Sequence, residues 1–140
     1  MPTAGAVALP ALDTTLSTSA PSSLLPAPVA PPRIICSRTR PGPAAEMLAD
    51  ELDGELIHMG SAGAKAMAVV RGEADVYAHT GGQYEWDSCA PVAVAAAAGL
   101  HATRLDGERL VYNREDPYLP DLLICRPELV EQVLQILINA

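Results

Sequence analysis

The sequence lacks the features that would place the protein in a membrane or in an oxidising compartment. No apolar run reaches the roughly 18–20 residues that a membrane span requires. The first Lys or Arg is Arg33, so no basic segment typical of a secretory signal precedes it. The three cysteines, Cys36, Cys89 and Cys125, are widely spaced and form no Cys-x-x-Cys pair, which indicates neither a zinc site nor a disulfide framework. We therefore expect a cytoplasmic protein with reduced, buried thiols.

Positive charge is scarce as well. The chain has 9 Lys and Arg residues against 17 Asp and Glu residues, a formal net charge of -8. This balance argues against a nucleic-acid polymer as partner, because such a partner needs basic surface, but it permits a small anion in a local basic pocket. Hydrophobic residues make up 49% of the 140 positions, which is enough for one modest domain with its own core.

Residues 1–32 differ in composition from the rest of the chain. They contain seven of the 13 prolines and one charged side chain, Asp13. Because proline removes a backbone donor and interrupts helices, we expect no long helix here. The segment Gly5-Ala6-Val7-Ala8-Leu9 is typical of a short strand, yet no partner strand is apparent nearby. Residues 1–32 are therefore interpreted as a Pro/Ala-rich tail or as the last piece of a missing domain.

From residue 33 onward, strands and helices alternate. Short apolar or β-branched runs predict strands at 33–37, 55–59, 75–78 and 122–125. Helix-forming composition bounded by Pro and Gly predicts helices at 43–52, 62–71, 87–98 and 127–139. An Asp-Gly pair predicts the turn of a hairpin at 105–110. The alternation predicts a layered α/β domain over residues 33–140, and the hairpin favours a mixed sheet over a fully parallel one.

The pair Trp86-Asp87 is the first candidate for chemistry. Asp87 is predicted to lie at the start of an alanine-rich helix, with Pro91 in its first turn. One interpretation is a helix N-cap, in which the carboxylate accepts hydrogen bonds from free backbone N–H groups. The other is a ligand for a hard cation such as Mg²⁺, which prefers carboxylate oxygens. The two roles are compatible, because a cap fixes the carboxylate in position.

A second candidate is Gly60-Ser61-Ala62-Gly63-Ala64-Lys65. Small residues at the start of a helix let a phosphate approach the free N–H groups, where the helix dipole is positive. Ser61 has a hydroxyl to donate, and Lys65 follows one helical turn later. Close packing of the helix with a surface lysine explains the same residues. The segment is not a Walker loop, because Gly-Lys-Ser/Thr is missing.

The third candidate, Ser37-Arg38-Thr39-Arg40, follows the first regular strand. Ligands of open α/β sheets bind beyond the carboxyl ends of strands, and two arginines there suit a phosphate. A solvated loop is the alternative. The histidines show no metal-ligand spacing and are interpreted as structural or surface residues, and no Gly-x-Ser-x-Gly elbow is present.

Taken together, these segments resemble the inositol monophosphatase superfamily over residues 33–126. The lysine of Gly-Ser-Ala-Gly-Ala-Lys and the Trp-Asp-x-Cys-Ala-Pro form are similar to the 3′(2′),5′-bisphosphate nucleotidase branch, which dephosphorylates adenosine 3′,5′-bisphosphate in sulfur metabolism. Thr80 stands where inositol phosphatases usually have a glutamate. The further matching strings are Gly72-Glu73-Ala74-Asp75-Val76-Tyr77, Ala98-Gly99 and Asp106-Gly107.

The resemblance implies a set of roles. The fold would be the C-terminal half of an αβαβα phosphatase that hydrolyses phosphoric monoesters with Mg²⁺. Asp87 would bind the metal and lie near the substrate, Ser61 and Lys65 would contact the nucleotide phosphate, and Ser37 and Arg40 would lie at the nucleotide-binding strand end.

The resemblance also implies what is missing. The family's metal cluster depends on a glutamate pair and on an Asp-Pro-x-Asp-Gly-Thr motif, and neither is present in this sequence. Residues 1–32 would then be a remnant of a missing N-terminal metal-binding domain, and this chain alone would have little activity. The implied partners are a small phosphorylated substrate and either a second copy or a separately encoded N-terminal half. Two alternatives stay open: a non-catalytic nucleotide-phosphate binding module, and an inositol or fructose phosphate phosphatase.

Overall fold

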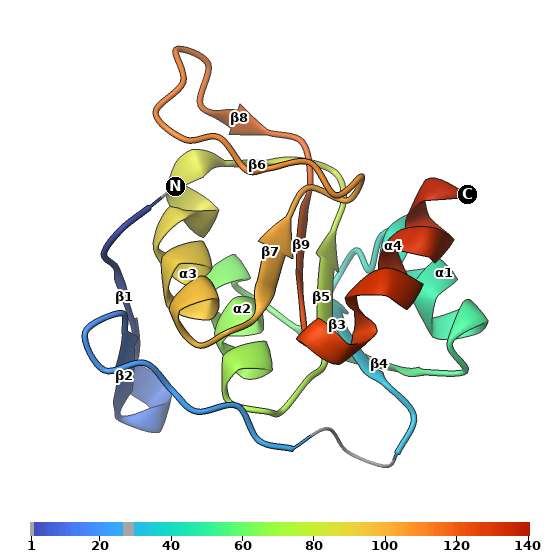
Figure 1. The fold of residues 1–140 in the computed structure, drawn as a ribbon, viewed down its shortest axis with the longest axis horizontal. Coiled ribbons are helices and arrows are strands. Elements are labelled where there is room, and N and C mark those ends of the chain that lie inside the picture. The colour runs from blue at the N-terminus through green and yellow to red at the C-terminus, as the bar shows by residue number, and fades with distance from the viewer. Residues whose placement is uncertain (1, 27–29) are drawn as a thin grey trace.

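The computed structural model describes residues 2–26 and 30–140, and its centre is a five-stranded mixed sheet (Figure 1). The strand order is β4-β3-β5-β9-β7. β3 runs parallel to β4 and β5, whereas β9 runs antiparallel to β5 and β7. The carboxyl ends of β3, β4 and β5 therefore lie at the same edge of the sheet. The predicted mixed sheet is confirmed. The bounds are β3 (Arg33–Ser37), β4 (Glu55–Met59), β5 (Val76–His79), β7 (His101–Thr103) and β9 (Leu122–Cys125).

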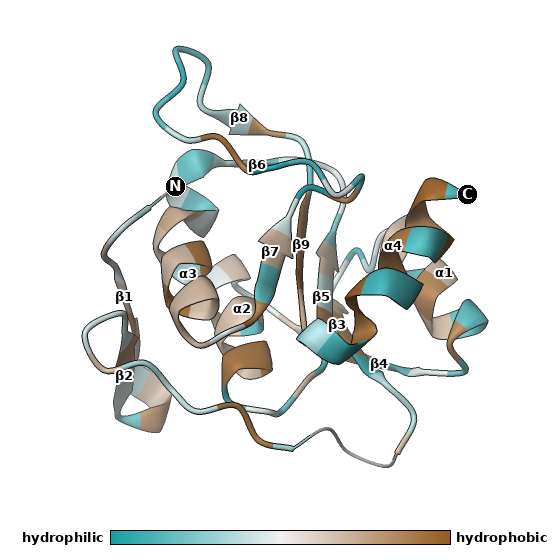
Figure 2. Ribbon diagram, in the orientation of Figure 1, coloured by the Kyte–Doolittle hydropathy of each residue, from teal (hydrophilic) through white to brown (hydrophobic). Residues whose placement is uncertain are grey.

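Helices cover both faces of this sheet. Alternation along the strands directs Ile34 and Cys36 toward one core, and Ile35 and Tyr77 toward the other. Figure 2 shows β9 as an almost wholly apolar strand, as expected for one that is buried on both faces. The first face is covered by α1 (Pro43–Glu51) and α4 (Val130–Ile138), and the second by α2 (Ala62–Val70) and α3 (Glu85–Ala97).

The N-terminal strand has a partner, so the expectation that it stands alone is wrong. β1 (Ala6–Leu9) pairs antiparallel with β2 (Thr14–Ser17). A 3₁₀ turn, η1 (Pro10–Leu12), and Asp13 at φ 49° reverse the chain between them. Val7, Leu9 and Leu16 pack on the core beside α2 and α3, so these helices lie between the hairpin and the sheet (Figure 1).

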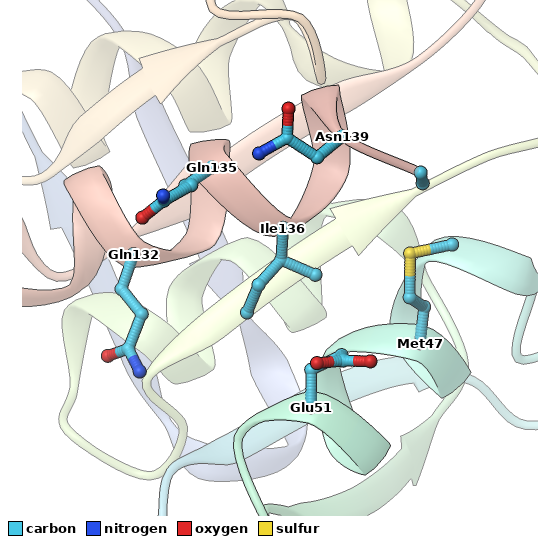
Figure 3. A pocket seen from close by; sticks show the side chains of 7 residues that line it. Met47, Glu51, Gln132, Gln135, Ile136 and Asn139 are labelled. Carbon is cyan, nitrogen blue, oxygen red and sulfur yellow. The ribbon is translucent and has the colours of Figure 1, made fainter.

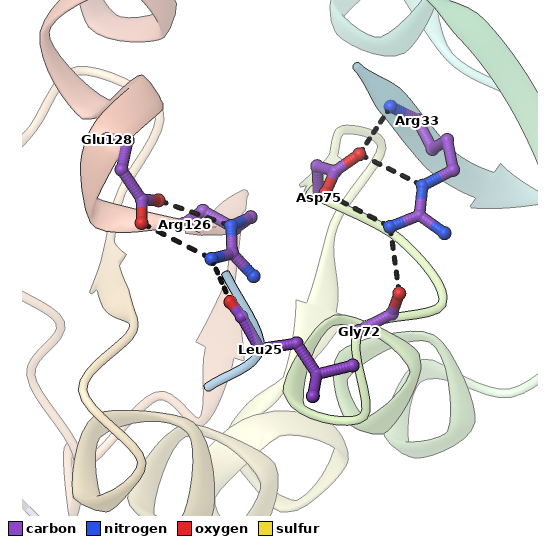
Figure 4. Close-up of polar contacts among 6 residues, drawn as sticks. All are labelled: Leu25, Arg33, Gly72, Asp75, Arg126 and Glu128. Carbon is purple, nitrogen blue, oxygen red and sulfur yellow. Dashed lines mark hydrogen bonds and ion pairs between the residues drawn. The ribbon is translucent and has the colours of Figure 1, made fainter. Parts of the chain in front are cut away.

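Two arginines hold the edge of the sheet opposite the parallel strand ends (Figure 4). Arg33 donates from Nε to Asp75 Oδ2 at 3.1 Å and from its terminal nitrogen to the Gly72 carbonyl at 2.8 Å. The guanidinium of Arg126, which is 2% exposed, donates to the carbonyl of Leu25. The segment that follows the N-terminal hairpin is therefore attached to the main domain by a buried side chain.

Two local predictions need correction. α3 begins at Glu85, two residues earlier than expected, so Pro91 lies inside the helix rather than in its first turn. The predicted hairpin at 105–110 is only a turn, in which Gly107 N donates to the Arg104 carbonyl at 3.0 Å. Asp121 accepts from Leu105 N at 3.0 Å and from Arg104 Nε at 2.6 Å, and these bonds replace strand pairing.

The remaining elements are short. β6 (Gln83–Tyr84) pairs antiparallel with β8 (Tyr118–Leu119) next to the start of α3. The predicted closing helix begins as a 3₁₀ turn, η2 (Pro127–Leu129), before it continues as α4. In the part of the chain that the structure describes, no helix has the length and apolar character needed to cross a membrane.

Candidate functional site

The loops that follow β3, β4 and β5 meet at one edge of the sheet. The guanidinium of Arg38 lies against Gly60, where an added Cβ would be 3.9 Å from Cζ. Thr80, after β5, packs against Gly42, and only a glycine leaves room for it there. Because the parallel strands end together, side chains from three separate loops surround this edge, the usual position of ligands in open α/β sheets.

Ser61 forms the start of α2 with an unusual backbone. It is a non-glycine residue at φ 71°, and its Oγ accepts from Ala64 N at 3.2 Å as the helix N-cap. Such a conformation is sparsely populated and costs on the order of 1 kcal/mol or more. The hydroxyl hydrogen remains available to donate, and the first N–H groups of the helix have no intrahelical acceptor. The turn therefore presents several donors at the strand-end edge.

Lys65 is the buried cation of this region. Its side chain is 5% exposed, and Nζ donates to the Met59 carbonyl at 3.3 Å and lies 5.6 Å from the centre of the Tyr77 ring. Burial lowers the pKa of the ammonium, an effect that the nearby Cys36 thiol partly opposes. No carboxylate lies within ion-pair distance of Lys65 among the described residues. The surface lysine of the alternative interpretation is therefore excluded, and a desolvated positive charge lacks an anionic partner.

Asp87 is the third residue of α3 rather than its N-cap residue. Its Oδ2 accepts from the backbone N of Tyr84 at 2.9 Å, so the carboxylate still satisfies a free donor at the helix start. In an α-helix the N–H of each residue donates to the carbonyl of the fourth residue before it, which for Pro91 is Asp87. Proline has no N–H, so the Asp87 carbonyl does not receive this hydrogen bond. Asp87 thus retains a second carboxylate oxygen and a main-chain carbonyl that the helix does not use.

Tyr77 is a buried tyrosine beside Lys65. Burial raises the pKa of its hydroxyl well above the usual range, and the negative charge of Asp87 raises it further. Lys65 lies over the ring of the same tyrosine. The hydroxyl is 3.4 Å from Nδ1 of His79, whose Nε2 is 3.0 Å from the Gly82 carbonyl. A carbonyl only accepts, so Nε2 has the hydrogen and Nδ1 accepts from Tyr77. His79 is therefore structural, as predicted.

Sequence reasoning missed Gln83. The residue is 7% exposed, and its amide lies near enough to the Tyr77 hydroxyl to oppose the rise in the pKa of that group, but no hydrogen bond of normal geometry joins it to another described residue. A buried, unpaired amide costs roughly 1–3 kcal/mol, and native proteins have few of them. Alternation of side chains in the two-residue strand β6 was the only available signal, and so short a strand is invisible to periodicity.

The predicted site residues are only partly brought together. Ser61 and Lys65 lie on the first turn of α2, and this turn packs against α3, the helix of Asp87, at Gly63 and Pro91. Ser37 ends the neighbouring strand, where its Oγ accepts from Arg40 N at 3.4 Å. Arg38 is the arginine of this loop whose guanidinium lies against Gly60, and a contact between Arg40 and a substrate stays a prediction.

The described residues do not form a metal centre by themselves. No group of three or more Asp, Glu, His or Cys side chains suited to a metal ion occurs in residues 2–26 and 30–140. Asp87 supplies one carboxylate, and one of its oxygens caps α3. Mg²⁺ needs a near-octahedral set of oxygen ligands, so these residues alone do not fit the predicted metal.

A separate pocket of about 420 Å³ lies between α1 and α4 (Figure 3). It belongs to the sheet face opposite α2 and α3, so it is not part of the strand-end site. Its charged side chain is Glu51, and it has no Lys or Arg in its lining. The pocket is therefore unsuited to a phosphate. The remaining lining residues are Met47, Gln132, Gln135, Ile136, Asn139 and Ala140.

Fold and site define a layered α/β protein whose strand-end edge has a buried lysine and a helix-start aspartate. The family model described as "Inositol monophosphatase family" matches residues 36–137, and the chain belongs to this family. The resemblance inferred from the sequence motifs is confirmed.

Curated relatives agree with the predicted branch. The chain is 48% identical over 145 residues to proteins named 3′-phosphoadenosine 5′-phosphate phosphatase from Mycobacterium bovis and Mycobacterium tuberculosis, with 99% of this chain and 53% of the relative covered. A protein of the same name from Mycobacterium leprae is 51% identical over 105 residues, which cover 75% of this chain and 39% of that one. The chain thus spans about half the length of the curated relatives it matches.

Solved structures confirm the fold. CysQ from Bacteroides thetaiotaomicron, a bacterial member of the inositol monophosphatase family, superposes with a TM-score of 0.63 at 31% identity, covering 73% of this chain and 40% of that one. An IMPase from Thermotoga maritima superposes with a TM-score of 0.73 over 98% of this chain and 56% of that one, at 16% identity. The predicted α/β class, half of an inositol monophosphatase-like fold, is confirmed.

Proposed function

We propose that this chain is the nucleotide-phosphate-binding half of a phosphatase that acts on adenosine 3′,5′-bisphosphate. The observation that supports this most directly is Lys65, a buried ammonium at the strand-end edge that has no carboxylate partner among the described residues. An unpaired buried charge is costly, so proteins retain one where a ligand neutralises it. The names of the relatives indicate the substrate class, a small nucleotide with two phosphates.

The proposed roles follow the geometry. Lys65 and the Ser61 hydroxyl bind one phosphate at the start of α2, where the helix dipole adds to the attraction. Ser37 and Arg40 contact the substrate from the neighbouring strand end. Asp87 lies beside the same phosphate and offers its free carboxylate oxygen to a cation that would neutralise the substrate.

Mg²⁺ is the metal we propose for the complete enzyme, where it would supply Lewis-acid chemistry at the phosphate and would lower the pKa of a bound water. Because Asp87 is the single candidate ligand among the residues that the structure describes, the other carboxylates would come from elsewhere, either from a separately encoded N-terminal half or from another copy. Residues 1–32 are proposed to be the end of that N-terminal half, and residues 33–140 the C-terminal domain. A cytoplasmic location is part of the same proposal.

A second function on the same site is a non-catalytic nucleotide-phosphate binding module. The observation that favours it is the lack of a group of three or more metal-binding side chains among the described residues. In that case nucleotide binding needs no metal and is lost in Lys65→Ala. The phosphatase instead predicts that Mg²⁺ strengthens binding through Asp87. An inositol or fructose phosphate as substrate would reverse the preference for a nucleotide in either assay.

The test of activity is phosphate release from adenosine 3′,5′-bisphosphate with Mg²⁺ by the purified chain. We expect turnover close to the background, because one carboxylate does not hold the metal ions that the reaction requires. Robust turnover that Asp87→Asn abolishes would overturn the proposed division of the site between two halves. Turnover that survives Asp87→Asn would indicate a contaminating phosphatase. The same turnover in Lys65→Ala would confirm the contamination.

A further inference from the structure

An exposed aromatic stack adjoins the start of α3. The rings of Tyr84 and Trp86 are parallel within 4°, with centroids 4.6 Å apart. The ring of Tyr118, from β8, meets Tyr84 edge-on at 6.1 Å and 78°. Trp86 is 68% exposed, so the indole face that is not against Tyr84 is open to solvent. Tyr84 and Tyr118 are 45% and 44% exposed.

The stack is held in place by the backbone around it. Gly82, at φ 81°, has no Cβ, and this lets the Tyr118 ring pack directly against it. Glu85 accepts from Asn113 N at 2.6 Å and from Arg114 N at 3.2 Å, which fixes the loop before β8 to the first turn of α3. The orientation of the indole is therefore set before any ligand arrives, and a preorganised surface loses little entropy on binding.

The position of the stack connects it to the strand-end site. Trp86 and Asp87 are consecutive residues in the first turn of α3, and the first turn of α2, which contains Lys65, packs against the same helix, where a Cβ added to Gly63 would lie 3.9 Å from Pro91 Cγ. A ligand with a phosphate at Lys65 and a planar group on its other side therefore has an aromatic face within reach. This is the arrangement of a nucleotide, in which a ribose separates phosphate from base.

We propose that the open face of Trp86 stacks against the purine base of the nucleotide. The proposal rests on the proposed function, because it assigns the base of the same substrate to a further residue. Base–aromatic stacking tolerates different bases, because every base has a π-face. Trp86 therefore distinguishes nucleotides from sugar phosphates without selecting strongly between adenine and guanine.

The sequence provides the probe, since Trp86 is the single tryptophan of the chain. Titration with adenosine 3′,5′-bisphosphate should quench and shift its emission in a saturable way, whereas ribose 5-phosphate should bind without that change. Guanosine 3′,5′-bisphosphate should behave like the adenosine compound. By calorimetry, Trp86→Ala should weaken nucleotide binding roughly ten- to a hundredfold and leave ribose 5-phosphate binding unchanged. Trp86→Phe, which retains a smaller aromatic face, should bind the nucleotide with an affinity between those of the wild type and Trp86→Ala.

The outcomes distinguish a failure of the stacking proposal from a failure of the proposed function. If the nucleotide binds with full dependence on Lys65 but Trp86→Ala binds it as tightly as the wild type, the stacking proposal is wrong and the proposed function stands. If Trp86→Ala weakens ribose 5-phosphate as much as the nucleotide, the indole supports the fold of the site rather than the base. If neither ligand binds the wild type, the proposed function fails and the stacking proposal fails with it.

Discussion

Replacement of the buried Lys65 by methionine should stabilise the folded protein while it removes phosphate binding. The two side chains have similar length and volume, so methionine preserves the packing that the apolar stem of Lys65 makes. Exchanging a buried charge for a well-packed apolar side chain is often neutral or stabilising by 1–4 kcal/mol. Because the ammonium retains the Met59 carbonyl and the Tyr77 ring face, we expect a gain of about 1–2 kcal/mol in the free energy of unfolding at pH 7.

The pH dependence of this gain follows from the pKa of Lys65. Burial holds the folded-state pKa below the ordinary value of 10.5. Between the folded and unfolded pKa values the unfolded chain binds more protons, so the contribution of Lys65 to the free energy of unfolding rises with pH. The advantage of Lys65→Met is therefore complete below the folded-state pKa and shrinks as the pH rises toward 10.5.

Urea unfolding of both proteins at pH 7 and pH 10 measures this difference, and the subtraction removes the titration of groups common to both. A gain of 1 kcal/mol corresponds to about 4 °C in Tm for a domain of this size. Arg71→Met is the matched control, because Arg71 ends the same helix and its ion pair with Glu73 is partly exposed. It should change unfolding by less than about 1 kcal/mol without this pH dependence. A loss of stability in Lys65→Met at pH 7 would refute the reasoning.

Three further predictions concern the framework of the site. Asp75→Ala removes the buried carboxylate that pairs with Arg33, and it should lower the free energy of unfolding in urea melts by about 3 kcal/mol. The control Glu73→Ala, which breaks a partly exposed ion pair, should lower it by less than about 1 kcal/mol, and equal losses would contradict the prediction. Gly82→Ala should destabilise by more than Gly81→Ala, because both have positive φ but only the first methyl meets a ring; differential scanning calorimetry compares them. Arg126→Met should speed proteolytic cleavage of residues 18–26, and unchanged cleavage would show that its bond to Leu25 does not hold the segment.

The central α/β alternation was predictable because strand runs, Pro and Gly boundaries and helix composition agree with one another along residues 33–104 and 122–139. The parallel order of β3, β4 and β5 follows from the helices that connect them, and that order placed the candidate loops at one edge. The family motifs identified Lys65 and Asp87, which the fold places near the starts of two helices that pack against each other.

Other features depend on contacts that a sequence pattern does not contain. The partner of β1 is a polar Thr-rich strand that composition does not identify, and its pairing needs the left-handed Asp13. The failed hairpin after β7 depends on Asp121, seventeen residues beyond Arg104. α3 begins two residues earlier than predicted because the Asp87 side chain caps the helix from its third position. A carboxylate at the N-cap or at the third helical position satisfies a free N–H, so the sequence does not distinguish the two.

The most direct test of the strand-end site is a calorimetric titration of adenosine 3′,5′-bisphosphate into the wild type, Lys65→Ala and Asp87→Asn, each with Mg²⁺ and with a chelator. We predict that the wild type binds, that Lys65→Ala weakens binding at least tenfold under both conditions, and that Asp87→Asn weakens it only when Mg²⁺ is present. Binding that is equal in the wild type and Lys65→Ala, or absent from the wild type, would contradict the assignment of this edge as the nucleotide-phosphate site.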